Sequence, residues 1–262
     1  MEIDASTAQF VKAFYVTGKN TDVSGGGIWG MGGVSIDAAT RNVFTATGNA
    51  LTTSQSYRYA EHVVRLTPNL SLVAANYPGL AGTDVDFGGT PMLYHPPGCP
   101  GLLAVKNKNG TLFVYQRDFI DSGPLQRIQV ASPKDGAFQN LPAYSPVTNM
   151  LYVSNSSNSS LTGPYFHGLV AFDIQPDCTI ALAWQQTVGN RKVVVPPPTV
   201  ANGVVYYADA TGDQLFAFDA ATGAHLWDSG TLFTAALYGA PMVVDGHVYI
   251  GGIDGHLHAF GL

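Results

Sequence analysis

The chain has 262 residues, a formal net charge of −6 and only 11% charged residues. It contains no basic cluster and no apolar run of about 18 residues, which argues against nucleic acid as a partner and against a membrane-spanning helix. Thirty glycines and sixteen prolines indicate many tight turns between short strands. Residues 1–19 lack the basic start and the unbroken apolar core of a secretory signal.

One stretch recurs five times, most clearly at Asp209–Trp227 (DATGDQLFAFDAATGAHLW). Weaker copies lie at Asn109–Arg117, His167–Trp184 and Asp254–Phe260, and one with a longer insert begins at Arg41–Asn49. Repeats of several short strands at a spacing of about 40–50 residues are typical of a β-propeller. We therefore predict one all-β propeller domain, 1–262, with four-stranded antiparallel blades.

The turn signals divide the chain into about five blades. They cover approximately 26–77, 88–130, 141–187, 197–229 and 240–262. The fifth offers only three strands, and Gln9–Val16 is the candidate for the fourth, paired beside His256–Phe260 to cover an exposed edge. In the alternative interpretation, residues 1–17 are the remnant of a preceding blade.

Strand order predicts which loops share a face. If the first strand of each blade is innermost, the loop before it and the loop between the second and third strands open on one face. Trp29, Asp84, Asp86 and Asn140 precede first strands, and Asn49 and Lys108 lie between second and third strands. All are expected near the axis, on that face.

These residues occur in an ordered series of motifs: GGGIWG at 25–30, a TGN turn at 47–49, DVDFGG at 84–89, KNG at 108–110 and NLPAYSP at 140–146. The series resembles the central and C-terminal blades of quinoprotein alcohol dehydrogenases, which bind pyrroloquinoline quinone (PQQ) with a calcium or lanthanide ion. The likeness covers nearly the whole chain.

The resemblance implies a role for each matching position. Asn49 would be a metal ligand, and Asp86 the catalytic base that also contacts the metal. Lys108 would bind the ortho-quinone oxygens of the cofactor, Asn140 would hydrogen-bond to it, and Trp29 would stack on it. Gly88 stands where lanthanide-using members carry a second aspartate, so calcium is the expected ion.

General chemistry agrees with these roles. A hard cation prefers amide and carboxylate oxygens, a carboxylate can remove an alcohol proton, and a flat cofactor needs an aromatic platform. Each residue also has an ordinary interpretation. TGN and NG are common turn sequences, Trp29 can fill core space, Lys108 can be solvated, and Asp84 and Asp86 can cap a strand.

The resemblance also implies features that this sequence lacks. The blades that supply the family's glutamate metal ligand and its adjacent cysteine pair are not in this chain, and no Cys-x-x-Cys-His haem motif occurs. Two functions stay open. One is a quinoprotein-like oxidoreductase domain, or part of one with further blades upstream, acting on an alcohol or a sugar. The other is a non-catalytic propeller that serves as a binding or assembly scaffold for a protein partner.

The two cysteines are far apart in sequence. Cys99 follows the first strand of the second blade, and Cys178 follows the third strand of the third blade. These loops open on the same face of neighbouring blades, opposite the candidate site. A disulfide is therefore one prediction and two unrelated thiols the other; the disulfide favours a periplasmic or extracellular location.

Overall fold

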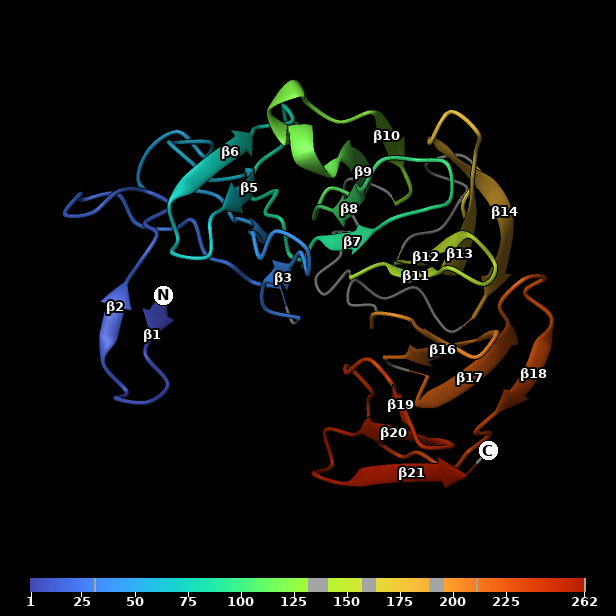
Figure 1. The fold of residues 1–262 in the computed structure, drawn as a ribbon. Helices are drawn as coiled ribbons and strands as arrows, with labels where there is room; N and C mark the ends of the chain where they lie inside the picture. The colour runs from blue at the N-terminus through green and yellow to red at the C-terminus, as the bar shows by residue number, and fades with distance from the viewer. Residues whose placement is uncertain (31, 132–140, 157–163, 189–195, 211, 262) are drawn as a thin grey trace.

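A computed structural model of the chain describes residues 1–30, 32–131, 141–156, 164–188, 196–210 and 212–261. The strands form an arc of five sheets around a common axis, as expected for a β-propeller (Figure 1). The first two blades contain β3 (Ser35–Ile36), β4 (Val43–Ala46), β5 (Val63–Leu66), β6 (Leu72–Asn76), β7 (Met92–Tyr94), β8 (Leu102–Lys106), β9 (Thr111–Gln116) and β10 (Gln126–Gln129). The third and fourth contain β11 (Ala143–Ser145), β12 (Met150–Asn155), β13 (Gly168–Ile174), β14 (Ile180–Thr187), β15 (Thr199–Ala201), β16 (Val204–Asp209), β17 (Gln214–Asp219) and β18 (His225–Asp228).

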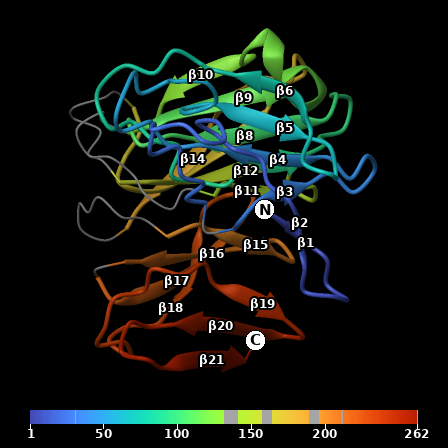
Figure 2. The same ribbon diagram turned by 90° about the vertical axis from the view of Figure 1, so that its left-hand side faces the viewer.

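The fifth blade has three strands, β19 (Met242–Val244), β20 (His247–Gly251) and β21 (Leu257–Gly261). In every blade the strands pair antiparallel in sequence order, and the first strand lies nearest the axis (Figure 1). The predicted fold class and blade boundaries are confirmed. In the side view, the strands of blades four and five lie one above another and run from one face of the propeller toward the other (Figure 2).

Position within the blade decides how the strands are buried. The middle strands β4 and β8 are buried along their whole length. Neighbouring blades cover both faces of β8, whereas β4 packs against blade two on one face and against Phe14 and Tyr59 on the other. The outer strands β6 and β18 carry mostly half-buried or exposed side chains. This difference explains the near-continuous apolar runs VFTA and LLAVK, which do not alternate as a half-exposed strand would.

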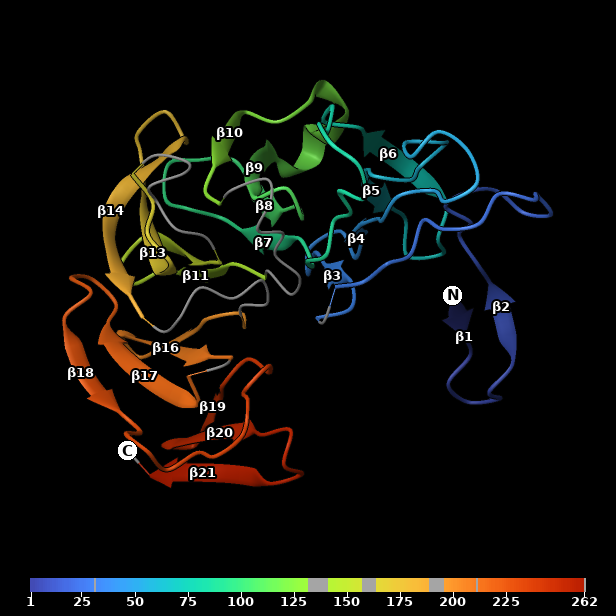
Figure 3. The same cartoon turned by 180° about the vertical axis from the view of Figure 1, so that it is seen from behind.

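The predicted closing strand is wrong. Residues 10–12 form β2 (Phe10–Lys12), which pairs with β1 (Glu2–Ile3) in a separate two-stranded sheet. Strand β21 pairs only with β20 among the described residues, and the N-terminal hairpin lies across the opening of the arc from blade five (Figure 3). The local hairpin forms because a turn at 4–9, held by Asp4, brings the two short strands together without a long-range contact.

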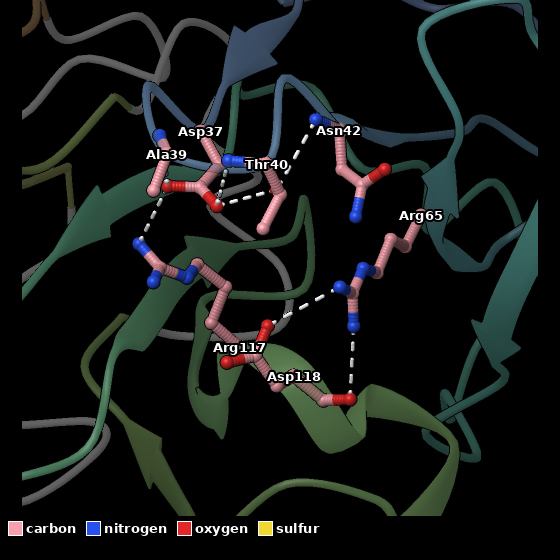
Figure 4. Close-up of polar contacts among 7 residues, drawn as sticks. All are labelled: Asp37, Ala39, Thr40, Asn42, Arg65, Arg117 and Asp118. Atoms are coloured by element: carbon pink, nitrogen blue, oxygen red, sulfur yellow. Dashed lines mark hydrogen bonds and ion pairs between the residues drawn. The ribbon is translucent and has the colours of Figure 1, made fainter.

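Two sets of contacts join neighbouring blades on the side of the ring away from the candidate site. The Arg117 guanidinium pairs with Asp37 at 3.2 Å, and the Arg65 guanidinium pairs with Asp118 at 3.3 Å (Figure 4). Both pairs link blade one to the start of the 3₁₀ helix η1 (Arg117–Ser122), which follows β9. Thr40 Oγ1 donates to the Asp37 carboxylate and orients it. Among the described residues, no helix is long and apolar enough to span a membrane.

The predicted Cys99–Cys178 disulfide is confirmed, with Cα atoms 5.7 Å apart. It joins the loop after β7 to the loop after β13, and both cysteines belong to the apolar cluster between blades two and three. The bond therefore covalently fixes two blades whose contact is otherwise non-covalent.

Replacing both cysteines with serine should lower the free energy of unfolding by about 2–5 kcal/mol, because the bond closes a long loop in the unfolded chain. The sequence separation of 79 residues places the effect toward the upper end of that range. Urea unfolding of the oxidised, the reduced and the Cys99→Ser/Cys178→Ser proteins measures it. Equal midpoints for all three would contradict the prediction.

Candidate functional site

The candidate site lies where blades one and two meet, and backbone hydrogen bonds fix its loops. The segment entering blade two, 84–87, runs between the turn of blade one and the turn of blade two. Phe87 N–H donates to Thr47 O at 3.3 Å, and Lys108 N–H donates to Asp86 O at 2.8 Å. Asn107 Nδ2 donates to Val85 O at 3.3 Å. Three sequence-distant loops are thereby held on one face, as the strand order predicted.

Asp86 is the centre of this arrangement. Its side chain is 4% exposed, its Oδ1 accepts from the backbone N–H of Asn49 at 2.6 Å, and its Oδ2 lies 3.6 Å from Lys108 Nζ. The structure therefore brings Asn49, Asp86 and Lys108 together, as expected for one site. Asn49 contacts Asp86 through its main chain, and its side-chain Nδ2 donates to Ala50 O at 3.3 Å.

Asp84 has a larger part than its sequence position suggested. Its carboxylate lies 2.5 Å from Lys108 Nζ, closer than that of Asp86, although Asp84 is mostly exposed. The hydrogen bond from Lys108 lowers the pKa of Asp84, while burial raises the pKa of Asp86. One ammonium group thus serves two carboxylates in different surroundings.

Glu61 is a member of the site that sequence reasoning missed. It is 2% exposed, its backbone N–H donates to Gly48 O at 3.0 Å, and its Oε1 has no hydrogen-bond partner. Burial, and next the charge of Asp86, raise its pKa to about 7. The available signal was a single carboxylate in YRYAEHVV, directly before the buried strand β5.

Trp29 lies beside the same turn. Its side chain is 56% exposed, and a Cβ built on Gly48 would overlap Asp86 Oδ1 and lie 2.6 Å from the indole Nε1 of Trp29. Residue 48 must therefore be glycine for the indole and the carboxylate to approach this turn together. An aromatic residue that is more than half exposed is suited to stacking on a flat ligand.

Asn140, the remaining predicted cofactor residue, lies outside the described residues. Within the described ranges, no group of three or more His, Cys, Asp or Glu side chains is arranged to hold a metal ion. A cation at this site would therefore depend on an amide oxygen as well as on carboxylates.

Two cavities lie elsewhere. An apolar cavity of about 560 Å³ lies between blades four and five, lined by residues that include Tyr206, Trp227 and Phe260. A smaller one of about 300 Å³ lies at the outer part of blade two, between Leu80 and Arg127. Neither is lined by Asp86 or Trp29.

Comparison with known proteins agrees with the propeller fold. The fold is that of a PQQ-repeat β-propeller, and residues 167–261 match the family model described as outer membrane protein assembly factor BamB. A search of curated protein sequences found no match.

Solved structures similar to this chain belong to two kinds of protein. BamB from Moraxella catarrhalis is 14% identical, with a TM-score of 0.55 over 87% of this chain and 56% of its own. Quinohemoprotein alcohol dehydrogenase ADHIIG from Pseudomonas putida HK5 is 14% identical, with a TM-score of 0.61 over 87% of this chain and 45% of its own. A europium-containing methanol dehydrogenase is 16% identical, with a TM-score of 0.59 over 90% of this chain and 50% of its own. The chain thus spans about half the length of these proteins, and at such identities the likeness shows the fold alone.

Replacing Gly48 with alanine should destabilise the protein by about 1–3 kcal/mol, because the added methyl group overlaps Asp86 and crowds Trp29. It should also shift the fluorescence emission of Trp29 as the indole is displaced. Urea unfolding and tryptophan emission spectra measure both effects. Gly239→Ala is the matched control, since a Cβ there meets open space; equal losses of stability in the two variants would contradict the prediction.

The buried Glu61 carboxyl should make stability depend on pH. Its pKa rises from 4.5 to about 7 on folding, so the folded chain keeps a proton that the unfolded chain releases between these values. Stability from this group is complete below pH 4.5 and is lost as the pH rises to about 7, by on the order of 2–3 kcal/mol.

Glu61→Gln should therefore be more stable than the wild type at pH 8 in the presence of a chelator, and the difference should shrink toward pH 4. Urea midpoints at several pH values measure it. A difference that does not change with pH would refute the assignment to Glu61.

Proposed function

We propose that this chain is a quinoprotein-like oxidoreductase domain, or part of one, that oxidises an alcohol or a sugar with PQQ and a calcium ion. The observation that carries the proposal is the convergence of Asn49, Asp86 and Lys108 beside the exposed ring of Trp29. They come from four separate loops, and ordinary turn formation alone gives no reason for them to meet.

The side chains present fit both groups. Asp86 and Glu61 are buried carboxylates, Glu61 Oε1 lacks a partner, and Asn49 adds an amide, so the oxygen types that calcium prefers are present. Lys108 pairs with both Asp84 and Asp86, so one ammonium group is shared by two carboxylates, and a cation would add to the positive charge beside them. Trp29 offers an aromatic surface for the flat cofactor.

When bound, PQQ supplies the two-electron acceptor. Asp86 would accept the hydroxyl proton of the substrate, and burial, which raises its pKa, strengthens it as a base. Lys108 would donate to cofactor oxygens, held in position by Asp84 at 2.5 Å. Asn49 and Asp86 would hold the cation.

A second function has its own support. The BamB family match falls on 167–261, which cover the outer half of blade three and blades four and five, whereas the candidate site lies in blades one and two. Lys108 also pairs with both Asp84 and Asp86 without any ligand. These observations favour a scaffold that binds a protein partner. In either case the disulfide supports a location in the periplasm or outside the cell, where such bonds persist.

Adding PQQ and Ca²⁺ to the purified protein should give a bound quinone absorbance and dye reduction with alcohols or sugars. Asp86→Asn should lower dye reduction by a factor of about 10²–10⁴, since it removes the general base. Trp29→Ala should weaken PQQ binding, and the exposed Asp121→Asn is the control.

The absence of PQQ binding by the wild type would contradict the enzyme proposal and favour the scaffold. Binding that Trp29→Ala and Asp86→Asn leave unchanged would place the cofactor elsewhere on the propeller.

A further inference from the structure

The Glu61 carboxylate lies in surroundings that would be unfavourable for a charge without a partner. The residue is 2% exposed, its Oε1 accepts no hydrogen bond, and none of the ion pairs among the described residues includes it. Burying a polar group without a partner costs free energy, and a charged one costs more. A neutral side chain of similar size would avoid this cost.

The backbone holds Glu61 firmly in this position. Its φ of 59° lies in the left-handed region, which glycine or asparagine adopts more easily. Hydrogen bonds hold both sides: Glu61 N–H donates to Gly48 O at 3.0 Å, and His62 N–H donates to Thr47 Oγ1 at 3.0 Å. The main chain at Glu61 is therefore fixed against the same turn, 47–49, that contains Asn49.

The same turn lies beside Asp86. A Cβ built on Gly48 would overlap Asp86 Oδ1, which accepts from the Asn49 N–H at 2.6 Å, and Gly48 O accepts from the Glu61 N–H, so Glu61 and Asp86 both lie against this turn. Lys108 Nζ lies 3.6 Å from Asp86 and pairs more closely with the exposed Asp84. Among the described residues, no ion pair joins a cationic side chain to Glu61.

We infer that Glu61 is an oxygen donor to a hard divalent cation, together with Asp86 and the side-chain amide of Asn49. The inference rests on the proposed function. It adds a glutamate of this chain to the residues proposed to hold the cation. Two carboxylates and an amide match calcium, which takes oxygen ligands and fills its remaining positions with water or other oxygens.

The site should then bind Ca²⁺ in the absence of PQQ. Tb³⁺ is a suitable probe because it replaces Ca²⁺ and emits when a nearby indole is excited, and Trp29 lies against the same turn. The wild type should show Tb³⁺ emission that Ca²⁺ displaces, heat of Ca²⁺ binding by calorimetry, and a higher melting temperature with Ca²⁺ than with a chelator.

Glu61→Gln should weaken cation binding by at least about tenfold and abolish the Ca²⁺-dependent rise in melting temperature. Its melting temperature in chelator at pH 8 should equal or exceed that of the wild type, which shows that it folds. Asp86→Asn should weaken binding similarly, and Asp121→Asn should behave as the wild type. A purely structural Glu61 would not make the melting temperature depend on Ca²⁺.

Wild-type affinity in Glu61→Gln would overturn the inference; if Asp86→Asn still lost binding, the proposed function would stand with a different donor set. No binding of Ca²⁺ or Tb³⁺ by the wild type would also overturn the inference, and PQQ binding in the presence of Ca²⁺ would then test the proposed function separately. Loss of binding in Asp121→Asn as well would place the cation elsewhere and overturn both the donor set and the site.

Discussion

The contacts of Asp86 hold the candidate site together. Its main-chain carbonyl accepts from Lys108 N–H in blade two, and its carboxylate accepts from Asn49 N–H in blade one. The residue therefore fixes the distance between the two blades at the point where both turns face the axis. The same contacts bury its carboxylate. Asp86 is therefore both the residue that connects the two blades and the candidate base, and a substitution there should affect both roles.

Contacts on the opposite face of the propeller also hold blades one, two and three together. The Cys99–Cys178 disulfide ties blade two to blade three, and the Arg117–Asp37 and Arg65–Asp118 pairs tie blade one to blade two. Because each sheet packs on its neighbours, restraints on one face limit the rotation of the blades that would separate loops on the other. The disulfide and these two arginine ion pairs therefore restrain the blades from the face opposite the candidate site.

The repeat predicted the fold well because every blade repeats the same turns and apolar strands, so the signal adds up over five copies. The positions of Asn49, Asp86 and Lys108 followed from strand order, which places equivalent loops on one face. The pairing of Gln9–Val16 could not be predicted, because an edge strand has no preference for a distant partner over a local hairpin. Glu61 was missed because its burial depends on how a long insert folds back on the 47–49 turn.

Charge balance is the physical quantity that separates the two functions. In a scaffold, buried carboxylates serve no purpose that asparagine or glutamine would not serve at lower cost, and Lys108 would be expected to pair with the buried Asp86 first. Here Lys108 is closer to the exposed Asp84, at 2.5 Å, than to Asp86, at 3.6 Å, and Glu61 has no cationic partner among the described residues. The proposed cation would be attracted by the negative charge of these carboxylates, whereas a scaffold would have to tolerate the cost of burying them.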